Sequence, residues 1–114
     1  MLPIERARLL AQDIRESEEY RDFERQKELI ASDDAISTLL KEYTRMQMGI
    51  QLQAAAGQSP DQDTVTRFNQ LSALLYADSR TGAYLTAQIR LQKMAAEVLQ
   101  VVGDAAGLNE QMLL

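Results

Sequence analysis

The sequence predicts an all-α protein. Only two prolines and five glycines interrupt its 114 residues. Apolar residues recur at spacings of three and four, as on one face of a helix, and no stretch alternates β-branched with polar residues as a strand would. A chain of this length forms one domain on the usual expectation, so we predict a single helical domain over residues 1–114, built as an elongated antiparallel bundle of about four to five helices.

The first two helices are marked by their starting residues. Pro3 suits a first helical turn, where its missing N–H costs nothing, and the spacing predicts a helix as far as Glu16. Ser17 is a good N-cap for the second helix, because Glu18 and Glu19 then face the positive end of the helix dipole. The predicted inner stripe of the second helix is Tyr20, Phe23, Lys27 and Ile30.

A hairpin is predicted between the third and fourth helices. Ser32 or Asp33 caps the third helix, and Gly57 ends it in a left-handed conformation. The fourth helix begins in a capping-box pattern formed by Ser59, Pro60 and Gln62. The stretch "ADSRTGAY", residues 77–84, interrupts the pattern before the last helix.

The last helix has the longest apolar stripe, with steps of four and three residues as in a heptad. Its members are Ala87, Leu91, Met94, Val98, Val101, Ala105 and Leu108. A helix of about 25 residues is roughly 38 Å long, whereas a compact chain of this size is about 34 Å across. The last helix would thus span the whole domain, and a second copy could cover the apolar stripe along its length. We therefore expect a dimer with a shared core, or a higher oligomer, whose interface consists of Leu91, Met94, Val98, Val101 and Ala105.

A second apolar face appears late in the third helix, at Met48, Leu52 and Ala55. Methionine at helical spacing commonly fills a core or a dimer interface, but it also makes adaptable binding surfaces. Both interpretations of "YTRMQMGIQL" remain open, and this face is the predicted partner surface.

The composition argues against an enzyme. Without cysteine or histidine, the chain offers no thiolate or imidazole to ligate a metal and no cysteine or histidine for catalysis. We predict no cofactor, no metal and no catalytic residue.

The charge balance argues against nucleic acid. A net charge of −5 repels phosphate, and no basic patch offsets it, so no direct nucleic-acid binding is expected. No run of 18 apolar residues exists, which predicts no membrane insertion. The first residues lack the features of a secretory signal, and we expect a cytoplasmic protein.

The most highly charged stretch is "SEEYRDFERQKE", residues 17–28, with five carboxylates and three basic groups. Interleaved opposite charges, such as Asp22 and Arg25, predict an ion-paired, solvated helix face. A carboxylate metal site and a nucleic-acid patch are the weaker interpretations. A small-anion site near Arg80, at the start of the last helix, is a further alternative.

Two long stretches resemble the YlbF/YmcA family of small bacterial helical proteins. The first, residues 10–47, contains the Ser-Glu-Glu-Tyr start of a second helix at Ser17, followed by an acidic turn at Asp33 and a leucine pair at Leu39. The second is "AYLTAQIRLQKMAAEVLQVVGDAAGL", residues 83–108, which is similar to the family's long last helix. Together they cover nearly the whole chain.

The resemblance implies a regulatory protein that acts by binding other proteins. Members form dimers and act in complexes that affect RNA processing by a membrane-associated ribonuclease, with effects on competence, sporulation and biofilm development. Implied partners are a second copy, other family members or a ribonuclease-associated complex. Some members carry cysteines implicated in an iron–sulfur cluster, and this sequence has none. The alternatives are a nucleic-acid-binding regulator and a structural family member with no assigned role.

Overall fold

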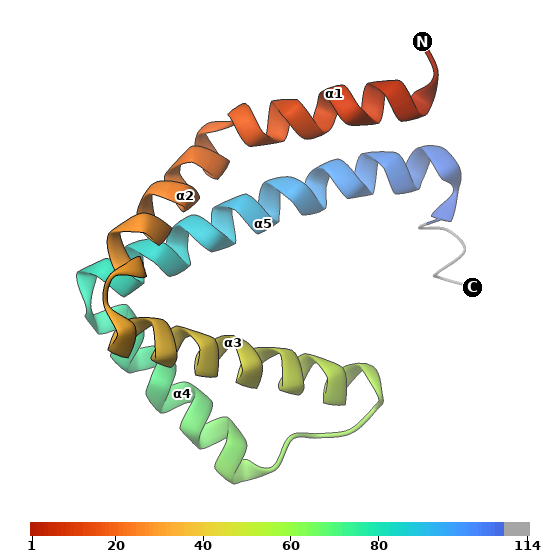
Figure 1. Cartoon of the computed structure of the whole chain (residues 1–114). Helices are drawn as coiled ribbons and strands as arrows, with labels where there is room; N and C mark the ends of the chain where they lie inside the picture. Colours follow the sequence, from red (N-terminus) through yellow and green to blue (C-terminus); the bar gives the residue numbers. More distant parts are fainter. Residues whose placement is uncertain (109–114) are drawn as a thin grey trace. The chain divides into compact units, whose positions relative to one another are not determined.

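The computed structural model describes residues 1–108, and the regular secondary structure in this part of the chain is all helical, with no strand. The predicted all-α fold and long last helix are confirmed. Its five helices are α1 (Pro3–Glu16), α2 (Glu18–Ala31), α3 (Asp34–Ala55), α4 (Gln62–Ala77) and α5 (Ser79–Ala106) (Figure 1).

The described chain divides into two compact units. One unit combines Met1–Arg25 with the chain from Thr86 onward, and the other is Gln26–Leu85. Helices α2 and α5 each contribute residues to both units. The single domain and the dimer with a shared core remain predictions.

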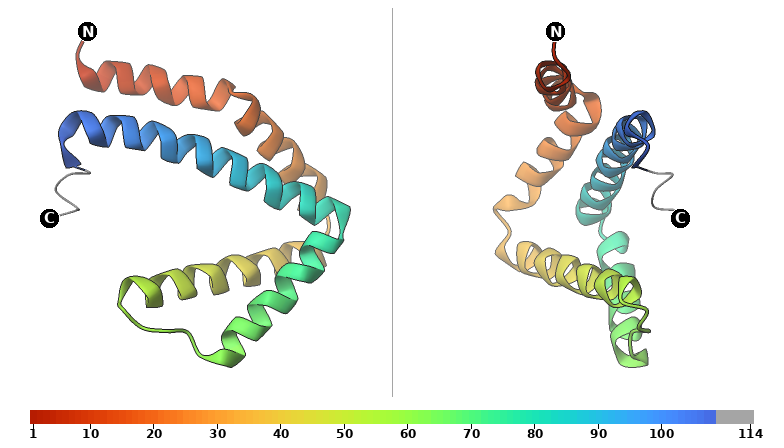
Figure 2. Two further views of the ribbon diagram at one scale, coloured as in Figure 1. Left: turned by 180° about the vertical axis from the view of Figure 1, so that it is seen from behind. Right: turned by 90° about the vertical axis from the view of Figure 1, so that its right-hand side faces the viewer.

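The unit Gln26–Leu85 contains the hydrophobic core cluster. Helices α3 and α4 run in opposite directions on either side of the loop that joins them (Figure 2). The rings of Tyr43 and Phe68 stack between these helices, with centroids 4.9 Å apart and planes 15° from parallel. The buried members of the cluster are Ile30, Ile36, Leu40, Tyr43, Leu75 and Leu85.

The junction of α4 and α5 is held by a buried hydroxyl. Thr81 is 1% exposed, and its Oγ1 donates a hydrogen bond to the backbone carbonyl of Leu75, with the carbonyl of Asp78 at 3.3 Å. A Cβ on Gly82 would lie 3.3 Å from the carbonyl oxygen of Tyr76. The first turn of α5 therefore packs closely against the last turn of α4.

Three of the predicted helix ends are confirmed. The backbone N–H of Tyr20 donates to Ser17 Oγ at 3.2 Å, so Ser17 caps α2. Asp33, one of the two residues predicted to cap α3, accepts from the N–H of Ile36 at 3.1 Å. Gly57 follows α3 with a φ of 76°, the left-handed conformation that glycine adopts without strain.

The predicted start of the fourth helix is wrong. Helix α4 begins at Gln62 rather than Pro60, and its N-cap is Asp61, which accepts from the N–H of Thr64 at 2.8 Å. A carboxylate makes a stronger, charge-assisted bond to this N–H than the hydroxyl of Ser59 would, and its charge suits the positive helix end. The last helix also starts earlier than predicted, because Asp78 alone breaks the chain and accepts from the N–H of Arg80 at 2.8 Å.

Replacing Thr81 with valine tests the junction. Valine has nearly the same shape but leaves the carbonyl of Leu75 without its buried donor, so Thr81→Val is expected to lower the unfolding free energy by about 1–2 kcal/mol in a denaturant titration. The control is Thr66→Val on the exposed side of α4, which should stay within about 0.5 kcal/mol. Equal losses at the two sites would mean that the buried hydrogen bond is not stabilising.

The cap of α4 can be located by comparing two alanine variants. Asp61→Ala should lower the melting temperature and Ser59→Ala should leave it unchanged, because only Asp61 bonds to the helix start. Hydrogen bonds from Thr64 lower the pKa of Asp61 below its ordinary 3.8. A lowered folded-state pKa stabilises above the unfolded-state pKa, and this contribution is lost as the pH falls through the folded value. The difference in melting temperature between Asp61→Ala and the parent should therefore be largest near neutrality and shrink in acid.

Candidate interaction surfaces

The predicted oligomer interface lies on α5, within the unit that contains α1. Leu91, Met94 and Val98 are half-buried, Ala105 is exposed, and Val101 is 70% exposed. Helix α1 has no buried residue at all. Large apolar side chains are exposed on both helices of this unit: Ile4 and Leu9 on α1, and Ile89, Leu99, Val101 and Val102 on α5.

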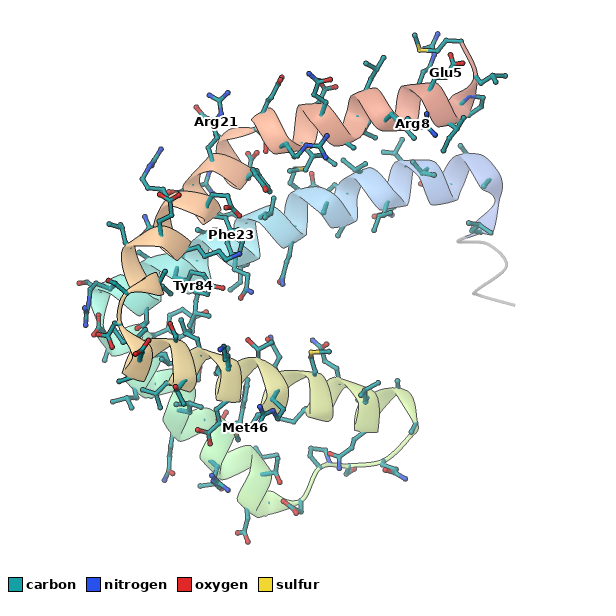
Figure 3. All side chains as sticks on the ribbon, in the orientation of Figure 1. Glu5, Arg8, Arg21, Phe23, Met46 and Tyr84 are labelled. Atoms are coloured by element: carbon teal, nitrogen blue, oxygen red, sulfur yellow. The ribbon has the colours of Figure 1, made fainter. Side chains whose placement is uncertain are left out.

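A polar cluster in the same unit joins α2 to α5. Asp22 lies 3.5 Å from Arg25 and 3.7 Å from Arg90, measured between carboxylate oxygen and guanidinium nitrogen. With Glu18 and Arg21 these residues line a cavity of about 420 Å³ (Figure 3 labels Arg21). The predicted Asp22–Arg25 pair is confirmed, but Asp22 is not on a fully solvated face. Its side chain is only 29% exposed because α5 approaches it.

The two methionines of "YTRMQMGIQL" lie on different sides of α3. Met46 lines a small cavity with Leu71 and Leu74 of α4, and Figure 3 shows it on the side of α3 that faces α4. Met48 is 57% exposed and Leu52 70% exposed, and Ala55 is exposed as well. The Met48, Leu52 and Ala55 face is therefore not part of the core of its unit, and its role as a partner surface remains a prediction.

A groove beside Met48 combines apolar side chains with cations, and sequence reasoning missed it. It has a volume of about 620 Å³, and Lys27, Lys41 and Arg45 stand around it. Among the described residues, none of these three forms an ion pair, and no carboxylate lines the groove. Its other lining residues are Ile30, Ala31, Ser37, Leu40, Thr44, Met48 and Tyr84.

The structure argues against a small-anion site at Arg80. Its guanidinium lies 3.3 Å from Asp78 and 3.7 Å from Asp33. The hydrogen bonds between Arg80 and Asp78 raise the pKa of the arginine and lower the pKa of the aspartate. Two carboxylates already offset this cation, so an added anion would gain little.

The described residues contain neither a cluster of metal ligands nor a helix that could span a membrane. Across residues 1–108, no group of three or more acidic side chains is arranged to hold a metal ion. Within the same residues, no helix has both the length and the apolar character needed to cross a bilayer.

These features define a small all-helical protein with uncovered apolar helix faces. The chain belongs to the YlbF/YmcA family: residues 4–105 match the family described as "Control of competence regulator ComK, YlbF/YmcA". The predicted family resemblance is confirmed. The family is thus described by a regulatory role rather than by a reaction.

Relatives from other bacteria agree with this assignment. A UPF0342 protein of Desulfitobacterium hafniense (strain Y51) is 32% identical over 101 residues, covering 89% of this chain and 82% of the relative. A UPF0342 protein of Caldicellulosiruptor saccharolyticus is 23% identical over 103 residues, with 90% and 86% covered. A solved structure, "Protein of Unknown Function (DUF964) from Bacillus stearothermophilus", has the same fold, with a TM-score of 0.72, 18% identity and 95% coverage of both chains.

The bridge between α2 and α5 can be measured by a double-mutant cycle. Asp22→Ala and Arg90→Ala should couple by about 0.5–1 kcal/mol in unfolding free energy, since both side chains are partly exposed. Added salt at 1 M should reduce this coupling, because it screens exposed charges. Repeating the cycle with Arg21→Ala in place of Arg90→Ala provides the control, for which no coupling is expected.

Proposed function

We propose that this protein is a non-catalytic, cytoplasmic regulatory adaptor that works by binding other proteins, beginning with a second copy of itself. The observation that carries the proposal is the uncovered apolar surface of α1 and α5. Helix α1 is 14 residues long and buries none of them. Helices of this length are marginal in water and are stabilised mainly by packing an apolar face, so a partner surface would supply what the helix lacks.

The stripe on α5 is suited to a second copy. Its steps of three and four residues match the seam of a coiled coil, in which two equivalent helices insert side chains between each other. A two-fold interface needs a self-complementary patch, and a stripe of Leu, Met, Val and Ala without a charged member meets that need. Full burial of one valine or leucine contributes about 1.5–3 kcal/mol, so several such positions together would offset part or all of the entropy lost on association.

The family description supports a regulatory role for such an assembly. Its members are described by their control of a competence regulator. In this proposal the self-associated chain binds further partners. These partners are other family members or a complex that contains a ribonuclease. An effect on RNA processing would then arise through the bound partner rather than through chemistry on this chain.

The main alternative is a nucleic-acid-binding regulator. A net charge of −5 opposes it, because binding to a phosphate backbone depends on neutralising cations. A gel shift that appears at low salt and disappears on added salt would favour that alternative.

Val101 offers a test of self-association that leaves the fold intact. Because Val101 is 70% exposed, Val101→Asp should not disturb the packing within its own chain, but it would place an unpaired charge in the proposed interface. Light scattering coupled to size exclusion should show a dimer or larger assembly for the parent and a smaller mass for Val101→Asp. Gln92→Asp, an exposed position away from the stripe, is the matched control and should keep the parent mass.

A concentration series separates a shared core from a self-sufficient monomer. If assembly stabilises the fold, the melting temperature of the parent rises with protein concentration, and that of Val101→Asp does not. A parent that is monomeric, with a melting temperature constant over a hundredfold concentration range, would overturn the proposed self-association.

A further inference from the structure

We propose that the groove lined by Lys27, Lys41, Arg45 and Met48 binds an acidic amphipathic helix of a partner protein. This inference rests on the proposed function, because it assigns the adaptor a second surface and gives the chemistry of what binds there. The groove lies entirely within the unit Gln26–Leu85, and two of its lining residues, Ile30 and Leu40, belong to the core cluster of that unit. It also includes Met48, one member of the predicted partner surface.

The shape of the groove fits a helix. One wall is a continuous face of α3 that runs from Ser37 through Lys41 to Met48, which is about 16 Å or three helical turns. The floor contains Ile30 and Leu40, both buried. An apolar stripe of a partner helix, with contacts at successive turns, would cover the exposed Ala31 and Met48 above this floor.

The positive charge around the groove favours a partner helix that carries negative charge. Three cations stand around the groove, and in the described part of the chain they have no ion-pair partner, although the protein as a whole carries −5. Lys41 and Arg45 are one turn apart on α3, and Lys27 projects from α2. Glutamates or aspartates on either side of a partner's apolar stripe would meet these cations, whereas a basic helix would be repelled.

Small anions and membranes fit the groove less well. Enclosed small-molecule sites bury most of their ligand, but six of the ten lining residues here are themselves exposed: Lys27, Ala31, Lys41, Thr44, Arg45 and Met48. A single phosphate would also leave the exposed Ala31 and Met48 uncovered. A bilayer surface is flat on this scale and would contact the cations without reaching the buried floor at Ile30 and Leu40.

A second copy of the chain is not the favoured occupant. Its α5 helix carries Arg90 and Lys93 as well as Glu97, so it does not present a uniformly acidic border. The groove and the α5 stripe are therefore assigned to different partners: an acidic helix in the groove and another copy on the stripe.

The test uses a fluorescein-labelled 18-residue helical peptide with leucines at positions 4, 8, 11 and 15 and glutamates on both sides of the stripe. Two further peptides are matched to it: one has lysine in place of every glutamate, and the other has glutamine in place of every leucine. Fluorescence anisotropy at low salt should show binding of the glutamate–leucine peptide to the full chain. Each matched peptide should bind at least about tenfold more weakly, because each lacks one of the two complementary features.

Variants of the protein locate the site. Lys41→Glu/Arg45→Glu should weaken binding of the glutamate–leucine peptide by at least about tenfold. Arg6→Glu/Arg8→Glu makes the same change in net charge on α1, which contributes no residue to the groove, and should alter binding less than about twofold. Circular dichroism should show the parent helicity in both variants. Amide chemical shifts between Ser37 and Met48 should move on adding the peptide, and those of α1 should not.

Several outcomes would overturn the inference. One is equal binding of the glutamate and lysine peptides, or binding that both double variants retain. Binding to phosphatidylglycerol vesicles, lost in Lys41→Glu/Arg45→Glu while the glutamate–leucine peptide does not bind, would assign the groove to a lipid surface. A drop in the mass of Lys41→Glu/Arg45→Glu in light scattering would assign it to a second copy. If the parent assembles as proposed but binds no peptide, only this inference fails, whereas a monomer that binds the peptide would contradict self-association alone.

Discussion

The stacked rings of Tyr43 and Phe68 join α3 to α4 within the hydrophobic core cluster. Around them, the unit Gln26–Leu85 buries leucine and isoleucine from four helices. The other unit has no comparable cluster among its described residues, and no residue of its α1 helix is fully buried. This uneven distribution of apolar burial underlies the proposed function, because one unit holds the core cluster and the other exposes large apolar side chains.

The helices could be predicted because their signals are local. Apolar spacing and capping residues act within one or two turns, so Ser17, Asp33 and Gly57 were recognisable from the sequence. The error at α4 has the same local character. Ser59 and Asp61, two residues apart, are both acceptable N-cap residues. Residue types alone do not indicate whether the hydroxyl of Ser59 or the carboxylate of Asp61 accepts the hydrogen bond at the helix start.

The surfaces were less predictable because they depend on tertiary contacts. The spacing along α3 separates Met48 from Met46, but it does not reveal that Met46 lies beside α4 or that Met48 lies beside basic side chains. In the sequence, Asp22 is indistinguishable from the other charged residues of its helix. In the structure it lies 3.7 Å from Arg90, which is 68 positions further along the chain. The basic groove needs Lys27 of α2 beside Lys41 of α3, and no sequence pattern joins those two positions.

The two kinds of surface differ in what they can contribute to regulation. An apolar stripe such as that on α5 supplies association energy but little selectivity, since one hydrophobic helix substitutes readily for another. Fixed charges around an apolar floor add selectivity, because they attract one class of helix, repel the opposite class and speed the encounter with the right one. The proposed adaptor role would draw on both properties. The two surfaces are proposed to bind different partners because α5 exposes apolar residues, whereas the groove is surrounded by cations without ion-pair partners among the described residues.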